Sequence, residues 1–249
     1  MSGHSKWHSI KHKKAAADSK RGKIFTSLIK EITVAARMGG GDPDGNPRLR
    51  TGVLAAKAVN MPSENIKRAI QKGTGELPGQ SYEDAAYEGY GPGGVAVLVT
   101  AVTDNKNRTV SEIRHIFAKH GGNLGQTGSV AHMFHKKGLL VVEKSKINED
   151  ALMGIVLDAG AEDMKEAGEV FEVYTDPKDF EPVHEALRKN NIETVSAELA
   201  MIPLISVHLE GRQVDQMLRL METLEEHEDI QKVFANFDFD DAQLEASAS

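Results

Sequence analysis

Apolar residues recur at spacings of three and four over residues 23–38, which is the period of a helix buried along one side. Gly39, Gly40 and Gly41 end this helix, and a turn-rich loop follows. A second helix is predicted over about 47–59 and a third over 64–72, with Ser63 as the N-cap of the third. Three helices joined by short connections predict a small three-helix bundle over 21–79.

Beyond residue 80 the apolar pattern becomes that of short strands alternating with single helices. Strands are predicted at 86–90, 95–103 and 129–135, with a helix at 109–120 between the second and third. A new series then predicts strands at 139–143, 162–165, 169–174 and 192–199, with helices at 149–159 and 179–189. This β-α-β-β-α-β order is the ferredoxin-like signature.

The last elements, a strand at 204–209, a helix at 214–225 and a strand at 233–239, are too few to bury a core of their own. They are therefore predicted to complete the sheet begun at 82–135. The fold class that follows is multidomain, α and α+β, with the ferredoxin-like domain inserted into the middle one. The predicted parts are a basic arm (1–20), a three-helix bundle (21–79), a discontinuous α+β middle domain (80–137 with 204–240), the ferredoxin-like insertion (138–203) and a flexible tail (241–249).

Charge is divided very unevenly along the 249 residues. Residues 1–73, the basic segment, hold 15 Lys and Arg against 5 Asp and Glu, or 15 − 5 = +10. The remaining 176 residues hold 15 basic and 32 acidic side chains, or −17, which gives the overall −7. Such an asymmetry indicates a polyanion-binding segment on an acidic body. The alternative is a solvated basic surface that has no partner.

Lys and Arg neutralise phosphates and release counterions, which dominates non-specific affinity for nucleic acid. A tryptophan can stack on an unpaired base, and an Arg pair beside a Pro-bounded turn can reach phosphates or base edges. The candidate nucleic-acid-binding residues are Lys6, Trp7, Lys11, Lys13, Lys14, Lys20, Arg21, Lys23, Lys30, Arg37, Arg48, Arg50, Lys67 and Arg68.

Other chemistries have weaker signals. The chain has no Cys, which removes thiolate chemistry and disulfides. His4, His8 and His12 have the spacing of metal ligands on a helix, but flanking lysines oppose a cation. The glycine-rich stretches at 91–94 and 121–125 lack the Walker lysine. Ser129 with His132, and Asp104 with His115, have no nucleophile elbow or paired carboxylates around them. We therefore expect no enzyme activity, no cofactor, no metal and no small-molecule substrate.

No stretch of the sequence predicts a secretory signal or a membrane span. The start of the chain has no apolar core of the kind that signal peptides carry. The longest apolar runs, 95–102 and 201–207, have the length of strands. A cytoplasmic protein without a membrane partner is the expectation.

Several long motifs together resemble the YebC family, continuously over about residues 2–137 and more loosely to the end. They are Gly3-His4-Ser5-Lys6-Trp7, Ile10-Lys11-His12-Lys13-Lys14, Arg21-Gly22-Lys23, Asn46-Pro47-Arg48-Leu49-Arg50, Asn60-Met61-Pro62 with Asn65-Ile66, Tyr87-Glu88-Gly89-Tyr90-Gly91-Pro92-Gly93-Gly94, Thr103-Asp104-Asn105 with Asn107-Arg108-Thr109, and Lys119-His120-Gly121-Gly122-Asn123-Leu124. The resemblance implies a helical bundle, a middle α+β domain and a ferredoxin-like insertion, and it carries over no catalytic residues.

Members of the YebC family are described as DNA-binding transcriptional regulators, and others, including a mitochondrial translational activator of cytochrome oxidase, act on translating ribosomes. The resemblance therefore favours a DNA-binding transcriptional regulator. The alternative is a ribosome-associated translation factor that contacts ribosomal RNA, since no recognition helix of the helix-turn-helix kind is evident. A third class, a protein-interaction scaffold, would use the acidic ferredoxin-like unit and would bind no nucleic acid in a salt-sensitive way. The sequence does not predict the oligomeric state.

Overall fold

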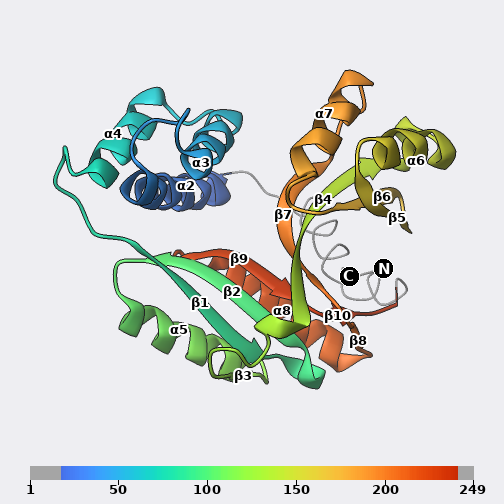
Figure 1. Cartoon of the computed structure of the whole chain (residues 1–249). Coiled ribbons are helices and arrows are strands. Elements are labelled where there is room, and N and C mark those ends of the chain that lie inside the picture. Colours follow the sequence, from blue (N-terminus) through green and yellow to red (C-terminus); the bar gives the residue numbers. More distant parts are fainter. Residues whose placement is uncertain (1–17, 241–249) are drawn as a thin grey trace.

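A computed structural model of the chain describes residues 18–240, with side chains described from residue 22 onward. The predicted basic arm up to residue 17 and the predicted tail, 241–249, lie outside these residues. Three lobes make up the described part: helices α2–α4, a sheet backed by α5 and α8, and a second sheet backed by α6 and α7 (Figure 1). The predicted combination of α and α+β architecture in a multidomain chain is confirmed.

The first lobe, the helical unit, consists of α2 (Asp18–Gly39), α3 (Pro47–Ala58) and α4 (Ser63–Thr74). Its core includes Ile32, Leu49 and Ile66, one from each helix. Helix α3 begins where the Asn46 side chain accepts a hydrogen bond from the Leu49 amide, 3.1 Å away. Helices α2 and α4 cross closely at Gly73, where a Cβ would lie 2.4 Å from the Thr33 carbonyl oxygen.

The second lobe, the middle unit, is a sheet of strand order β3-β1-β2-β9. Its elements are β1 (Glu83–Tyr90), β2 (Ala96–Thr103), α5 (Lys106–Lys119), β3 (Asn123–Leu124), α8 (Arg212–Glu226) and β9 (Ile230–Ala235), with a short 3₁₀ helix, η1 (Pro92–Gly94), between β1 and β2. Helices α5 and α8 contribute Phe117 and Leu220 to a core with Val97 and Val99 of β2. Strand β9 pairs antiparallel with β2 and so joins this sheet, whereas β8 (Val207–His208) and β10 (Phe237–Asp238) pair with each other in a separate two-stranded sheet.

The third lobe, the inserted unit, follows the middle unit's β3 and precedes its α8 in the chain. It contains β4 (Phe134–Glu143), η3 (Lys144–Lys146), α6 (Glu149–Asp158), β5 (Ala161–Ala167), β6 (Val170–Thr175), α7 (Phe180–Lys189) and β7 (Ser196–Pro203). Its strands are all antiparallel, in the order β5-β6-β4-β7. Leu140 and Val173 of the sheet share a core with Leu152 of α6 and Leu187 of α7.

Several predicted boundaries are wrong. The strands predicted at 129–135 and 139–143 are one strand, β4, because Lys136, Lys137 and Gly138 pair continuously with β7. Residues 131–133 instead form a 3₁₀ turn, η2 (Ala131–Met133). The strand predicted at 204–209 is reduced to β8 (Val207–His208), which pairs in parallel with β10 (Phe237–Asp238). Helix α4 begins at Ser63 itself, and no side chain caps it.

Because β4 and β7 are long, they run from the middle unit into the inserted unit (Figure 1). Where they leave the middle unit, the face of the middle sheet opposite α5 and α8 and the face of the other sheet opposite α6 and α7 share an apolar cluster. It contains Leu98 and Phe234 of the middle unit, and Leu139, Tyr174 and Ala200 of the inserted unit. Among residues 18–240, no helix combines the length and the apolar character that crossing a bilayer requires.

Candidate nucleic-acid interface

The predicted contact residues fall into two groups. Lys6, Trp7, Lys11, Lys13 and Lys14 lie outside the described residues, and Lys20 and Arg21 lie in α2 with side chains that are not described. The other seven are on the helical unit: Arg37, Arg50, Lys67 and Arg68 are exposed, Lys23 and Arg48 are half-buried, and Lys30 is buried. The structure therefore places only part of the predicted set on an open surface.

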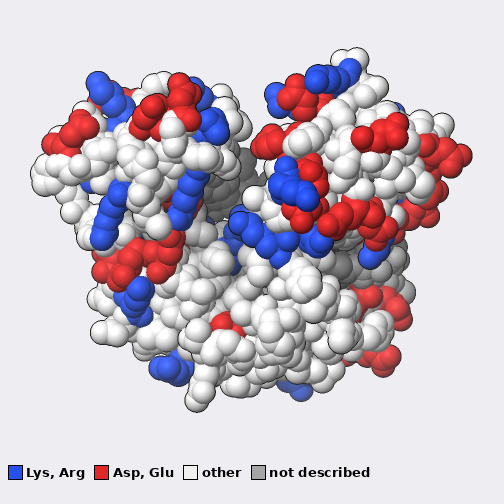
Figure 2. All heavy atoms as spheres, viewed as in Figure 1, with Lys and Arg blue, Asp and Glu red and all other residues white. Residues whose placement is uncertain are grey.

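The outward sides of α3 and α4 carry all the exposed cations described on the helical unit except Arg37, which is on α2. Besides Arg50, Lys67 and Arg68, they include Lys57 and Lys72, which the sequence reasoning missed although each lies on a predicted helix. Residues 22–74 hold nine basic and four acidic side chains, or +5, whereas residues 138–203 hold six and fifteen, or −9. On the face that Figure 2 shows, both lobes carry Lys and Arg together with Asp and Glu, and Asp and Glu are the more extensive on the inserted lobe.

Arg48 is engaged by two carboxylates in this structure. Its Nε and Nη2 bond both oxygens of Glu31 at 2.7 and 2.9 Å, and its Nη1 and Nη2 bond both oxygens of Asp84 at 2.7 and 2.8 Å. The hydrogen bonds that Arg48 donates to Asp84 and Glu31 raise the pKa of its guanidinium, and the same bonds to Asp84 lower the pKa of that carboxyl group. Arg48 thus joins α2, α3 and β1.

Lys30 is also withdrawn from the surface, because α2 packs its inner face against the start of β9. Its Nζ lies 2.6 Å from Asp229 Oδ1 and 3.0 Å from the Glu228 carbonyl oxygen. The Asp229 side chain is fully buried and also accepts from Arg108 Nη2 at 2.9 Å and Thr109 Oγ1 at 2.7 Å. Burial raises the pKa of Asp229, but the bonds from Lys30, Arg108 and Thr109 outweigh it and hold that pKa far below its usual range.

Arg37 is exposed but engaged by the connection between the helical and middle units. Its Nη1 donates to the Ser81 hydroxyl and, at 3.0 Å, to the Tyr82 carbonyl oxygen. Arg50 donates to the carbonyl oxygens of Pro43 and Asp44 at 3.3 and 3.2 Å. Both guanidinium groups therefore have fixed positions at the edges of the helical unit.

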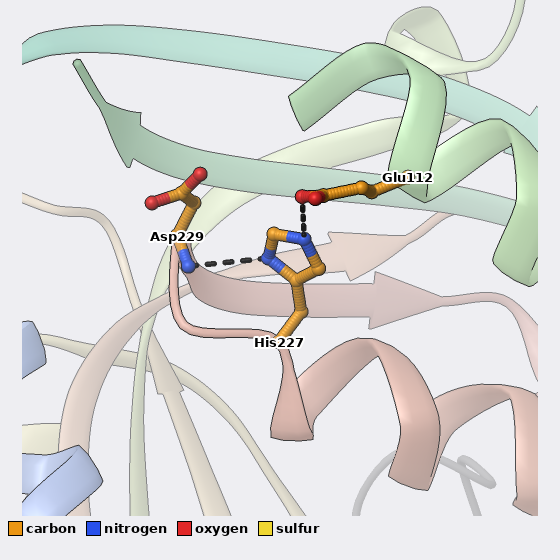
Figure 3. Close-up of side chains that lie close together, drawn as sticks. All are labelled: Glu112, His227 and Asp229. Carbon is orange, nitrogen blue, oxygen red and sulfur yellow. Dashed lines mark hydrogen bonds and ion pairs between the residues drawn. The ribbon is translucent and has the colours of Figure 1, made fainter. Parts of the chain in front are cut away.

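One cluster has the residue types of a metal site: Glu112, His227 and Asp229 place potential ligand atoms within 4.8 Å of one another (Figure 3). Both His227 ring nitrogens are engaged, Nδ1 with the Asp229 amide at 3.1 Å and Nε2 with Glu112 Oε2 at 2.9 Å. The Asp229 carboxylate already binds two cations, Lys30 and Arg108, which oppose a metal ion. The arrangement fits a structural hydrogen-bond network and not a cation site.

The loop that follows α5 is held by a buried carboxylate. Glu88 of β1 accepts the backbone N–H groups of Gly128, Val130 and Ala131 at 2.6, 2.7 and 2.8 Å. Burial raises the pKa of Glu88, but these three donors outweigh it, so the pKa lies below its usual range. The loop is fixed on β1. In the pair Ser129 and His132, which the sequence does not predict to be a hydrolytic site, His132 Nδ1 lies 3.3 Å from the Gly128 carbonyl oxygen.

Glu88→Gln is expected to lower the free energy of unfolding by about 2 kcal/mol, because an amide nitrogen would face N–H donors that need an acceptor. Glu83→Gln, on the same strand but exposed and paired with Lys106, is the control and should cost under about 1 kcal/mol. Because folding lowers the pKa of Glu88, its contribution is complete above the unfolded pKa near 4.3 and is lost as pH falls below it. Urea denaturation of both variants measures the difference, and equal midpoints would contradict this role.

Family models match nearly the whole chain. The model described as the TACO1/YebC protein N-terminal domain matches residues 5–76, and that of the TACO1/YebC second and third domain matches residues 82–237. The chain belongs to the TACO1/YebC family. The two matches meet at the connection that Arg37 holds, so the family's own division coincides with the boundary between the helical and middle units of this TACO1/YebC protein.

Relatives of this TACO1/YebC protein carry a common name. A protein of Acidobacterium capsulatum is 60% identical over 243 residues (98% of each chain), and one of Desulfosudis oleivorans is 59% identical over 246 residues (99% of this chain and all of the other). Each is named "probable transcriptional regulatory protein". A conserved hypothetical protein from Aquifex aeolicus, known from a crystal structure, is 47% identical to this chain in sequence. The two structures match with a TM-score of 0.83, and the match covers 93% of this chain and 96% of the other.

Proposed function

We propose that this protein is a non-enzymatic, cytoplasmic regulator of gene expression that binds DNA through its basic segment. The observation that carries the proposal is the +10 charge of residues 1–73 on a body of −17. The transcriptional role is supported by the name that its relatives carry. Within the described residues, the proposed phosphate contacts on α3 and α4 are the exposed side chains of Arg50, Lys57, Lys67, Arg68 and Lys72.

The proposed domains are the basic arm, a three-helix bundle, a discontinuous middle domain and a ferredoxin-like insertion. The shared core of α2, α3 and α4 supports the bundle. The chain order β4-α6-β5-β6-α7-β7, folded into a sheet of order β5-β6-β4-β7 with both helices on one face, supports the ferredoxin-like assignment. In this division the inserted domain supplies the acidic surface and the bundle the basic one.

A ribosome-associated translation factor that contacts ribosomal RNA is the second candidate. It is favoured by the outward faces of α3 and α4, which do not resemble a recognition helix. The α3 face presents Leu54, 60% exposed, and on α4 Glu64 lies 3.4 Å from Arg68. Such faces suit contacts with a phosphate backbone better than reading of base edges, and structured RNA offers that backbone as well as DNA does.

Sedimentation with purified ribosomes, repeated with excess duplex DNA as competitor, separates the two candidates. A DNA-binding regulator is released from ribosomes by the competitor and binds duplex DNA saturably on its own. Co-sedimentation that excess duplex DNA cannot displace would overturn the DNA proposal in favour of ribosomal RNA. Failure to bind either polyanion at low salt would overturn both.

A further inference from the structure

We propose that docking of the helical unit on the middle unit is autoinhibitory: Asp84 and Asp229 hold Arg48 and Lys30 in place of phosphates, and a polyanion binds more tightly once the helical unit is released. This inference rests on the proposed function and concerns the regulation of the same basic surface. Its basis is that two cations of the basic segment are neutralised by carboxylates of the acidic body.

Polar side-chain contacts join the two units, and α2 also lies against β2 there, with Val34 and Val102 both buried. Each unit has its own apolar core, and among the described residues neither core contains members of both units. The side-chain contacts that join them include Ser27 to Gln231 at 2.6 Å, Lys30 to Asp229, Arg48 to Asp84, and the Lys30 ammonium 5.7 Å from the Tyr82 ring centroid. Each unit therefore keeps its own apolar core when the two separate.

The Arg48–Asp84 pair resembles the contact that a phosphate would make. A guanidinium fork bonds a carboxylate and a phosphate with the same two-point geometry. Both side chains are partly open to solvent, with 36% of Arg48 and 46% of Asp84 exposed. Glu31, from the helical unit itself, keeps its own two bonds to Arg48 when Asp84 is exchanged for a phosphate.

The buried Lys30–Asp229 pair does not prevent release, because Asp229 has other hydrogen-bond partners and Lys30 becomes hydrated. When the units separate, Asp229 keeps Arg108, Thr109 and, at 3.2 Å, Thr103, all from its own unit. Lys30 returns to water, and this hydration offsets much of the attraction that a buried pair provides. The connecting residues 75–81 are exposed, and Gly75 adopts φ +84°, so the connection can change direction.

In this proposal the polyanion binds best to molecules whose helical unit is released, so the apparent affinity rises with the fraction of molecules in that state. A substitution that weakens docking should therefore tighten polyanion binding. Asp84→Asn should bind a short DNA duplex about two- to fivefold more tightly than the matched control Glu83→Gln. Both substitutions remove one negative charge and one exposed ion pair on β1, but Glu83 pairs with Lys106 inside the middle unit. Equal affinities of the two variants, with wild type binding the duplex, would overturn autoinhibition alone. Absence of duplex binding in all three would overturn the proposed function with it.

Release can also be measured directly, because the chain has no native cysteine to compete for labels. Ala55 on α3 and Ala118 on α5 are both exposed, so Ala55→Cys and Ala118→Cys place a donor–acceptor pair across the interface. Adding duplex DNA should lower the energy-transfer efficiency, and Asp84→Asn should lower it before any DNA is added. Unchanged efficiency in samples where the duplex is bound would overturn the proposal.

Discussion

Asp229→Asn is expected to lower the free energy of unfolding by about 3 kcal/mol, a larger loss than Glu88→Gln should cause. The fully buried carboxylate accepts hydrogen bonds from Lys30, Arg108, Thr103 and Thr109, and an asparagine can satisfy only part of this set. The amide NH₂ would face hydroxyl and cationic donors, which leaves buried donors without acceptors. Chemical denaturation monitored by circular dichroism measures the loss.

Asp104→Asn is the matched control for this prediction. Asp104 also accepts from Arg108 Nη2 at 2.9 Å, but its side chain is 23% exposed and water can replace the lost bond. Its cost should stay below about 1 kcal/mol. Because folding lowers the pKa of Asp229, the stabilisation is complete above the unfolded value near 3.9 and disappears as pH falls below it. Equal stability of the two variants at neutral pH would show that the Asp229 network does not anchor the fold.

The second large effect concerns binding. Changing Lys11, Lys13 and Lys14 together to Glu is expected to weaken binding to duplex DNA by at least about a hundredfold at physiological salt. The substitutions remove the three proposed lysine–phosphate contacts, and three new negative charges repel the polyanion. Electrophoretic mobility shift or fluorescence anisotropy titration measures the affinity.

The control for the triple variant makes the same charge change on the acidic body. Lys146, Lys165 and Lys178, all in residues 138–203, are changed to Glu together. If overall charge alone determined binding, both triple variants would bind equally weakly. We expect the control to keep most of the wild-type affinity, because screening limits each charge to a range of about 8 Å.

Periodicity in the sequence was sufficient to predict α2, α3 and α4, because each helix buries one side in a shared core. The order of strands and helices in the inserted unit also followed from the sequence. The error at β4 has a physical cause: Lys136 and Lys137 interrupt the apolar run, yet their backbone groups continue the ladder with β7. The pattern of apolar and polar residues depends only on the side chains of one short stretch. Whether a strand continues through Lys136 and Lys137 depends instead on backbone pairing with β7, whose residues lie sixty or more positions further along the chain.

The candidate site was predicted less completely, for a similar reason. Charge counts identified the basic segment but gave no information on which cations are already paired. Lys30 meets Asp229 across 199 positions, and Arg48 meets Asp84 across 36. Asp229 carries no motif of its own, so no signal in the sequence would have singled it out. Lys57 and Lys72 could have been found by asking which side of each predicted helix faces away from the core.

The most direct test of the central claim, that the basic segment binds nucleic-acid phosphates, is the salt dependence of binding to duplex DNA. The logarithm of the association constant is predicted to fall linearly with the logarithm of salt concentration, with a slope of about −4 or steeper. Changing Lys11, Lys13 and Lys14 to Glu should reduce the slope by about 3 units. A slope near zero, or the same slope in wild type and the triple variant, would contradict the claim.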